Sequence, residues 1–112
     1  MTFSRADVVW LRTDKLEGGL GKLDPAIVIS SNAFNDSHPF CIIIRGSSDV
    51  PADPEPEEYV VKKADGNGLD TDTVFYPIVQ TAEWARLTKK VGVVTPYQLK
   101  QIMARIRGIL EL

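Results

Sequence analysis

The chain has 112 residues, of which 44% are hydrophobic and 25% are charged, and its formal net charge is −2. This length leaves room for one domain, residues 1–112, and little more, and the composition is that of an ordinary globular protein. A charge this close to zero gives no overall attraction for nucleic acid, and no apolar run is long enough to cross a membrane.

Short runs of β-branched and aromatic residues predict six strands. They cover residues 7–12, 25–30, 40–45, 58–62, 71–81 and 90–94. The fifth run contains Pro77, and proline cannot donate a hydrogen bond to a β-ladder. We therefore expect this strand to be interrupted there or to lie at a sheet edge.

The segments between the strands carry turn and loop signals. Residues 13–24 are rich in glycine and predict a long flexible loop, and residues 31–39 allow one helical turn followed by a loop. Residues 49–58 hold three prolines and five acids, which predict a solvated excursion. Asp-Gly-Asn-Gly at 65–68 predicts a turn.

A single long helix is predicted at the C-terminal end. Thr95 is a suitable N-cap and Pro96 suits the first helical position. The apolar residues that follow recur at helical spacing up to the chain end at Leu112: Leu99, Ile102, Met103, Ile106, Ile109 and Leu110. Many short strands followed by one such helix predict a small β-barrel, or a curled sheet, capped by a C-terminal helix.

Few residues offer catalytic or metal chemistry. Cys41 lies in an apolar run and is expected in the core, and a single cysteine excludes an internal disulfide and fits a reducing cytoplasm. His38 is the only histidine; it could act as a base, but an exposed loop residue is the simpler interpretation. We expect no metal and no cofactor. Trp10 and Trp84 could stack on bases, although burial in the core or in a dimer interface is more usual.

The charges are distributed unevenly. The acidic segment 49–58 has no base, whereas residues 84–112 hold six bases and only one acid. A polyanion could bind the second region but not the first. Within it, Arg86, Lys89 and Lys90 could follow a phosphate backbone, and a solvated basic turn is an equally good interpretation.

Three segments carry a resemblance to a known family. In their order and spacing, residues 7–11, 25–35 and 83–99 resemble the opening strand, the second strand with its turn, and the last strand with its helix entry in MazF/PemK toxin endoribonucleases. The resemblance implies an SH3-like β-barrel, as also found in CcdB toxins, with a C-terminal helix. It further implies a homodimer, an antitoxin protein as partner, single-stranded RNA as substrate and a cytoplasmic location.

The site implied by this resemblance is altered. Family members cleave RNA without metal, using the 2′-hydroxyl of the RNA as nucleophile and an arginine directly before the second-strand proline; Asp24 stands at that position here. The acid of the family's long loop is represented only by Glu17, which is shifted in register. The hydroxyl pair at the end of the third strand is retained as Ser47 and Ser48, and Arg45 before it is new.

Two interpretations of the altered site remain. In the first the site is rebuilt: Arg45 or Lys22 supplies positive charge, Ser47 or Ser48 supplies a hydroxyl, and Glu17 or Asp24 acts as the base. In the second the fold persists as a catalytically inactive module that binds protein or nucleic acid. Arg45 is then a polar strand end, and the two serines belong to an ordinary turn. Convergence of Arg45, Lys22 and Ser47 in one groove would favour the rebuilt catalytic site.

Overall fold

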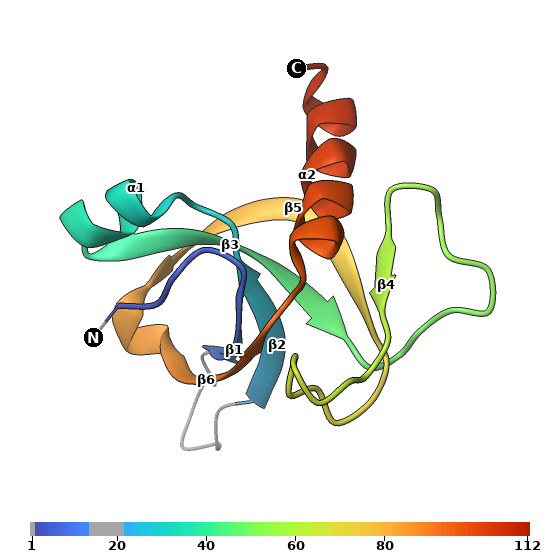
Figure 1. The fold of residues 1–112 in the computed structure, drawn as a ribbon, viewed down its shortest axis with the longest axis horizontal. Coiled ribbons are helices and arrows are strands. Elements are labelled where there is room, and N and C mark those ends of the chain that lie inside the picture. Colours follow the sequence, from blue (N-terminus) through green and yellow to red (C-terminus); the bar gives the residue numbers. More distant parts are fainter. Residues whose placement is uncertain (1, 14–21) are drawn as a thin grey trace.

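The computed structural model describes residues 2–13 and 22–112, which form a curled sheet with two α-helices (Figure 1). The elements, in chain order, are β1 (Asp7–Thr13), β2 (Lys22–Val28), α1 (Asn32–Ser37), β3 (Phe40–Ser47), β4 (Tyr59–Val61), β5 (Thr73–Glu83), the 3-10 turn η1 (Trp84–Arg86), β6 (Leu87–Val93) and α2 (Pro96–Leu110). The predicted fold class, mainly β with a C-terminal helix, is confirmed.

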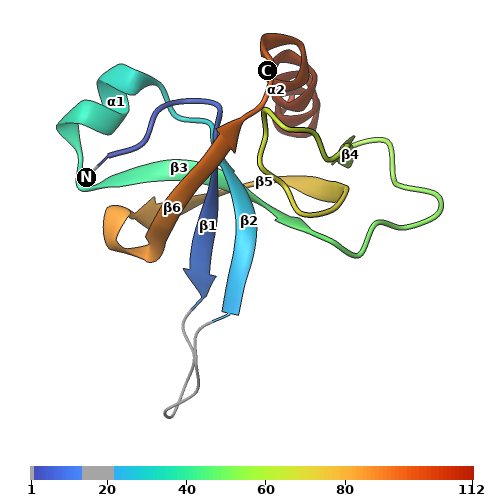
Figure 2. The ribbon, with the colours of Figure 1, turned by 60° about the horizontal axis from the view of Figure 1, so that its bottom comes forward.

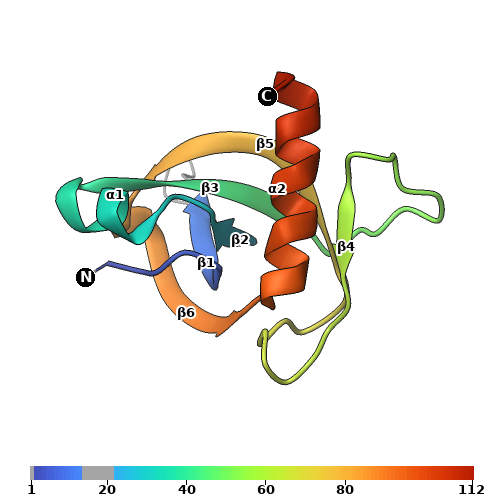
Figure 3. The same cartoon turned by 45° about the horizontal axis from the view of Figure 1, so that its top comes forward.

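The six strands form one antiparallel sheet in the order β4-β5-β3-β2-β1-β6. The sheet curls into a half-barrel, so that β6 at one edge turns back toward α2 (Figure 2). The helix α2 crosses the half-barrel, and α1 lies at its other end (Figure 3). Within the described residues, no helix is long and apolar enough to span a membrane.

Both faces of the sheet are buried, because successive side chains of a strand point to opposite faces. Val8 belongs to a core that also contains Ile27, Phe75 and the α2 residue Ile102. Its neighbour Val9 belongs to a second core that contains Cys41 and Leu87, with Trp84 packed partly against it. The continuous apolar runs of the central strands follow from this burial on two sides.

The predicted start of the C-terminal helix is confirmed. The Thr95 hydroxyl accepts a hydrogen bond from the Gln98 amide at 3.1 Å, and the Gln98 side chain accepts one from the Thr95 amide at 2.9 Å. This reciprocal arrangement satisfies two amides that the helix leaves without partners. At the C-terminal end of α2 the apolar stripe is only partly buried, since Ile109 and Leu110 are about half exposed.

The prediction for Pro77 is confirmed in part. β5 is one strand from Thr73 to Glu83 and lies between β3 and β4 in the sheet order. Its regular pairing with β3 is nevertheless interrupted at Pro77, and β4 pairs only with Thr73–Phe75. Ile44 pairs with Val79 and Gly46 pairs with Phe75, so three residues of β5 lie opposite Arg45 alone. Pro77 occupies the middle of this bulge, where the regular ladder is suspended and its missing N–H costs no hydrogen bond.

Cys41 is fully buried in the second core, as predicted. Burial disfavours the thiolate and raises the pKa of Cys41 from 9.0 to about 12. The thiol is therefore protonated and unreactive in the folded protein at neutral pH.

This burial predicts a dependence of stability on pH. Between pH 9 and about 12 the unfolded chain loses the Cys41 proton while the folded chain keeps it. The free energy of unfolding must therefore fall as the pH rises through this window. Urea unfolding from pH 8.5 upward should show a steeper fall for the native chain than for Cys41→Ala, in which every other titrating group is retained. Equal slopes would contradict the burial of the thiol.

Candidate functional site

Strands β2 and β3 separate at one end of the sheet. They pair only over three residues, Ala26 with Arg45 through Val28 with Ile43. The beginning of β2, from Lys22 to Pro25, pairs with β1 alone, and the end of β3 pairs with β5 alone. The separation opens two grooves that have Asp24 and Ser47 in common.

The first groove encloses about 320 Å³ and is built around an ion pair. Arg45 on β3 donates from Nη2 to Oδ2 of Asp24 on β2 at 2.5 Å. The Arg45 side chain is 42% exposed and that of Asp24 only 13%. The Arg45 side chain is therefore accessible to a ligand, whereas the Asp24 carboxylate is mostly buried. Its lining also includes Gly46, Ser47, Tyr76, Ile78 and Gln80.

Gly46 explains why Arg45 and Ser47 both face this groove. A Cβ at Gly46 would lie 2.8 Å from the Phe75 ring, so β3 passes directly over that ring. Because strand residues alternate, the close packing of Gly46 on one face directs its two neighbours to the other. The buried Phe75 thus fixes the strand from which the arginine projects.

The ion pair of Arg45 and Asp24 combines a group that can bind phosphate with a group that can accept a proton. A guanidinium has five N–H donors in a planar fork that matches the oxygens of a phosphate, and one bond to Asp24 leaves the fork able to make others. An ionised carboxylate can accept a proton from a hydroxyl group. The net charge of the pair is zero, which weakens its attraction for a polyanion compared with an arginine alone.

The structure brings together three of the predicted site residues, Arg45, Asp24 and Ser47. The Ser47 hydroxyl accepts a hydrogen bond from the Asp49 amide at 3.0 Å, and Ser48 lines only the second groove. Glu17 lies outside the described residues, as does the side chain of Lys22, whose backbone belongs to β2.

The three predicted RNA-binding residues Arg86, Lys89 and Lys90 make different contacts in the structure. Arg86 donates from Nε to the Arg12 carbonyl at 3.1 Å and lines a pocket of about 120 Å³. Gln80 lines both this pocket and the Arg45 groove, so the two adjoin. Lys90 forms an ion pair with Asp7 at 3.2 Å, and Lys89 is exposed.

The remaining candidates lie away from the ion pair. His38 precedes β3, at the opposite end of that strand from Arg45, and its ring stacks on Phe34 at 4.0 Å. Trp84 is half-buried and donates from Nε1 to the His38 carbonyl at 2.8 Å. Over the described part of the chain, no group of three His, Cys, Asp or Glu residues could hold a metal ion.

Sequence reasoning missed the two other polar residues of the groove, Tyr76 and Gln80. Tyr76 flanks the β5 bulge, and Pro77 was the available signal, since prolines within sheets occur at edges or bulges. Gln80 carried no such signal, because its position depends on its pairing with Ile43 of β3.

Comparison with known proteins agrees with this fold. Residues 4–110 match the family described as the PemK-like, MazF-like toxin of type II toxin-antitoxin systems. The chain belongs to this family. No protein of curated function matches its sequence.

Several solved toxin structures share the family fold. A MazE-MazF complex from Deinococcus radiodurans is similar with a TM-score of 0.82 at 19% identity, covering 100% of this chain and 99% of the other. The Mycobacterium tuberculosis toxin MazF-mt6 has a TM-score of 0.75 at 16% identity, covering 95% and 97%. A mycobacterial endoribonuclease in complex with its cognate antitoxin has a TM-score of 0.72 at 21% identity, covering 99% and 95%.

Proposed function

We propose that this PemK/MazF-like toxin is a metal-independent endoribonuclease whose site has been rebuilt around Arg45 and Asp24. The observation that carries the proposal is their direct contact at 2.5 Å in a groove that Ser47 also lines. A strand-borne arginine whose outer part is exposed can meet a phosphate, and a carboxylate next to it can meet the adjacent 2′-hydroxyl.

In this mechanism Asp24 removes the proton of the 2′-hydroxyl, and the oxygen attacks the neighbouring phosphorus. Arg45 neutralises the charge that develops on the phosphate oxygens, and the Ser47 hydroxyl donates a hydrogen bond to one of them. The bond from phosphorus to the 5′-oxygen breaks, and that oxygen takes a proton from water. The products are a 2′,3′-cyclic phosphate and a 5′-hydroxyl.

The assembly and location of the toxin are part of the proposal. Two of the similar structures are complexes, one of an endoribonuclease with its cognate antitoxin and one of MazE with MazF. By extension, we propose that this chain forms a homodimer, is held inactive by an antitoxin protein and acts on RNA in the cytoplasm. The single reduced thiol of Cys41 is compatible with that compartment.

A second candidate function is a catalytically silent module that binds a protein or a nucleic acid. It is favoured by the pairing of Arg45 with Asp24, because a carboxylate facing a phosphate opposes the charge of the arginine. This candidate predicts a folded protein that leaves RNA intact.

The test is incubation of the purified chain with a long single-stranded RNA in EDTA. We expect cuts that end in 2′,3′-cyclic phosphate, with a rate reduced about 10²- to 10³-fold in Arg45→Ala because a preorganised cationic donor is lost. Ser47→Ala should lose less, since a neutral hydroxyl contributes less than a guanidinium.

The matched control is Arg107→Ala, which removes an exposed arginine from α2, away from the groove. Its cleavage rate should equal that of the native chain. Intact RNA in the presence of the folded native protein, across RNAs of varied sequence, would reject the nuclease in favour of the binding module.

A further inference from the structure

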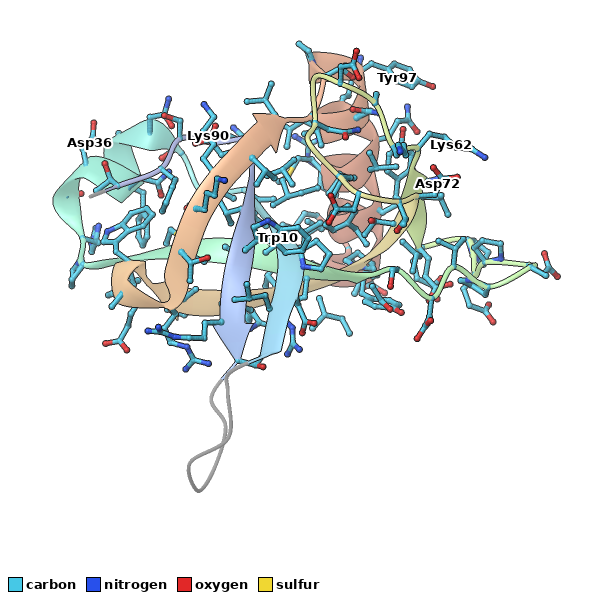
Figure 4. All side chains as sticks on the ribbon, turned by 90° about the horizontal axis from the view of Figure 1, so that it is seen from below. Trp10, Asp36, Lys62, Asp72, Lys90 and Tyr97 are labelled. Carbon is cyan, nitrogen blue, oxygen red and sulfur yellow. The ribbon has the colours of Figure 1, made fainter. Side chains whose placement is uncertain are left out.

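The Asn67 side chain holds together the turn between β4 and β5. Asn67 is 4% exposed, and its Oδ1 accepts hydrogen bonds from the Ala64 amide at 3.2 Å and the Leu69 amide at 3.0 Å. Its Nδ2 donates to the Lys62 carbonyl at 2.9 Å. Figure 4 shows the loop between the labelled residues Lys62 and Asp72 reaching the end of β6. The turn needs both an acceptor and a donor from this one side chain, and asparagine supplies both.

The residue that follows Asn67 must be glycine. Gly68 has φ of +68°, a conformation that residues with a side chain rarely adopt. A Cβ there would lie 2.1 Å from the Val91 carbonyl oxygen of β6, so there is also no room for one. The fold therefore requires an Asn-Gly pair at this place, for reasons that concern the two residues separately.

An Asn-Gly pair is chemically labile wherever the chain around it is free. The backbone nitrogen of the glycine can attack the side-chain carbonyl carbon of the asparagine, and glycine has no side chain to hinder this approach. Here the Gly68 nitrogen loses its proton and bonds to Cγ of Asn67, while the bond from Cγ to Nδ2 breaks and ammonia leaves. Water then opens the resulting cyclic imide at either carbonyl, which gives aspartate or isoaspartate.

The native turn opposes this attack. The Gly68 amide donates to the Ala64 carbonyl at 3.3 Å, and three hydrogen bonds hold the amide group of the Asn67 side chain. β6 packs against the turn, since a Cβ at Gly92 would lie 2.4 Å from the Asn67 carbonyl carbon. The side chain must leave these contacts before its Cγ can meet the Gly68 nitrogen. The rate of deamidation in the folded chain is therefore the rate in the open turn multiplied by the fraction of chains in which the turn is open.

The products do not fit the native turn. In aspartate a second carboxylate oxygen replaces Nδ2 and faces the Lys62 carbonyl across 2.9 Å, so two acceptors meet and a charge is buried. In isoaspartate the main chain runs through the side-chain carbon and gains one atom. This changes the path of the turn, whose Gly66 carbonyl accepts a hydrogen bond from the Val93 amide at 3.0 Å. Modification at Asn67 therefore hinders refolding.

We propose that Asn67 is a deamidation site that the native turn keeps closed, and that its reaction with Gly68 and then with water irreversibly removes chains that stay unfolded. The modification sets the time for which an unfolded chain can still return to the native state, so the operational stability of the protein is governed by a rate. The inference goes beyond the proposed nuclease and does not depend on it, because neither Asn67 nor Gly68 lines either groove.

The test is peptide mapping by mass spectrometry of the full chain, incubated at neutral pH either folded or unfolded in urea. Trypsin cuts after Lys63 and Arg86, which places Asn67 in a peptide with no other asparagine. In urea, deamidation at Asn67 should be at least about tenfold faster than at Asn32 or Asn35, whose following residues carry side chains. In the folded chain, deamidation of Asn67 should be at least about 100-fold slower than in urea.

A refolding experiment connects the modification to the loss of native chains. Chains are held unfolded in urea for increasing times and then diluted, and the refolded fraction is measured by circular dichroism. This fraction should fall in parallel with the fraction of unmodified Asn67, and the refolded material should contain unmodified Asn67 only. A parallel sample kept in urea at mildly acidic pH should refold almost completely, because the Gly68 nitrogen loses its proton less readily there.

Asn67→Asp reproduces one product directly. Its thermal midpoint should be lower than that of the native chain by at least about 10 °C, because a buried donor is replaced by a charged acceptor. Asn32→Asp is the matched control, since it makes the same change of charge at an exposed residue. The Asn32 Oδ1 accepts from the Arg5 amide at 2.8 Å, and aspartate retains that acceptor. The midpoint of this control should stay within a few degrees of the native value.

Three results would overturn the proposal. One is equal rates of deamidation at Asn67 in the folded and the unfolded chain. Another is deamidation in urea that is no faster at Asn67 than at Asn32. The third is a turn that accepts the product, seen either as refolded material rich in aspartate or isoaspartate at position 67 or as equal midpoints for Asn67→Asp and Asn32→Asp.

Discussion

Gly92→Ala is expected to lower the free energy of unfolding by about 3 kcal/mol, near the upper end of the cost of overpacking. A Cβ at Gly92 on β6 would lie 2.4 Å from the Asn67 carbonyl carbon and 2.5 Å from the Gly66 oxygen. Both obstacles are backbone atoms, so no side chain can rotate away. The neighbouring Val93 amide donates to that same Gly66 oxygen at 3.0 Å, and this bond would be displaced too.

The loss of stability should be large because the contact of Gly92 with Gly66 and Asn67 joins β6 to the segment between β4 and β5 on the open side of the half-barrel. The segment between β4 and β5 reaches across to β6 here and is itself fixed by the buried Asn67 side chain, which donates to the Lys62 carbonyl at 2.9 Å. Thermal unfolding followed by circular dichroism should show a midpoint lower by roughly 12–24 °C, at about 4–8 °C per kcal/mol for a chain of this size.

Gly66→Ala is the matched control, because a Cβ there has nothing within 4 Å. It should leave the midpoint within a few degrees of the native value, since surface substitutions typically change stability by less than about 0.5 kcal/mol. Equal midpoints for Gly92→Ala and Gly66→Ala would contradict the close approach of the two segments.

The parts of the fold that sequence reasoning predicted are those with local causes. The α2 start could be placed at its residue because Thr95 and Pro96, the two residues that mark it, are adjacent in the chain. The turn at 65–68 was predicted from residue type, and the structure uses Gly68 there with φ of +68°. The far end of α2 was predicted less well, since the helix ends at Leu110 and not at Leu112.

What could not be predicted depends on pairing between distant segments. Proline predicts an interruption or an edge at Pro77, and only the register of β3 and β5 shows that the interruption is a bulge within one strand. The contact of Arg45 with Asp24 likewise spans 21 positions along the chain. The sequence allowed Arg45 and Asp24 each to be named as a candidate, but their contact follows from the pairing of Ala26 with Arg45.

Asp24→Asn is the variant that decides between the two candidate functions of the Arg45 groove. If Asp24 is the base that removes the 2′-hydroxyl proton, the amide cannot replace it, and RNA cleavage should fall about 10²- to 10⁴-fold. The substitution keeps the shape of the side chain, and Arg45 is partly solvated, so the fold should survive. Circular dichroism and the thermal midpoint check this before rates are compared.

The interpretation in which Asp24 only neutralises Arg45 predicts the opposite result for the same variant, which makes the experiment informative. If Asp24 serves only to neutralise Arg45, its replacement releases the guanidinium, and RNA binding should tighten while cleavage stays absent or rises. Asp53→Asn removes one negative charge from the acidic segment, outside both grooves, and corrects for the change in net charge. A loss of cleavage confined to Asp24→Asn, with RNA affinity retained, therefore assigns the proton transfer to Asp24. A gain in either quantity means that this carboxylate restrains the arginine beside it.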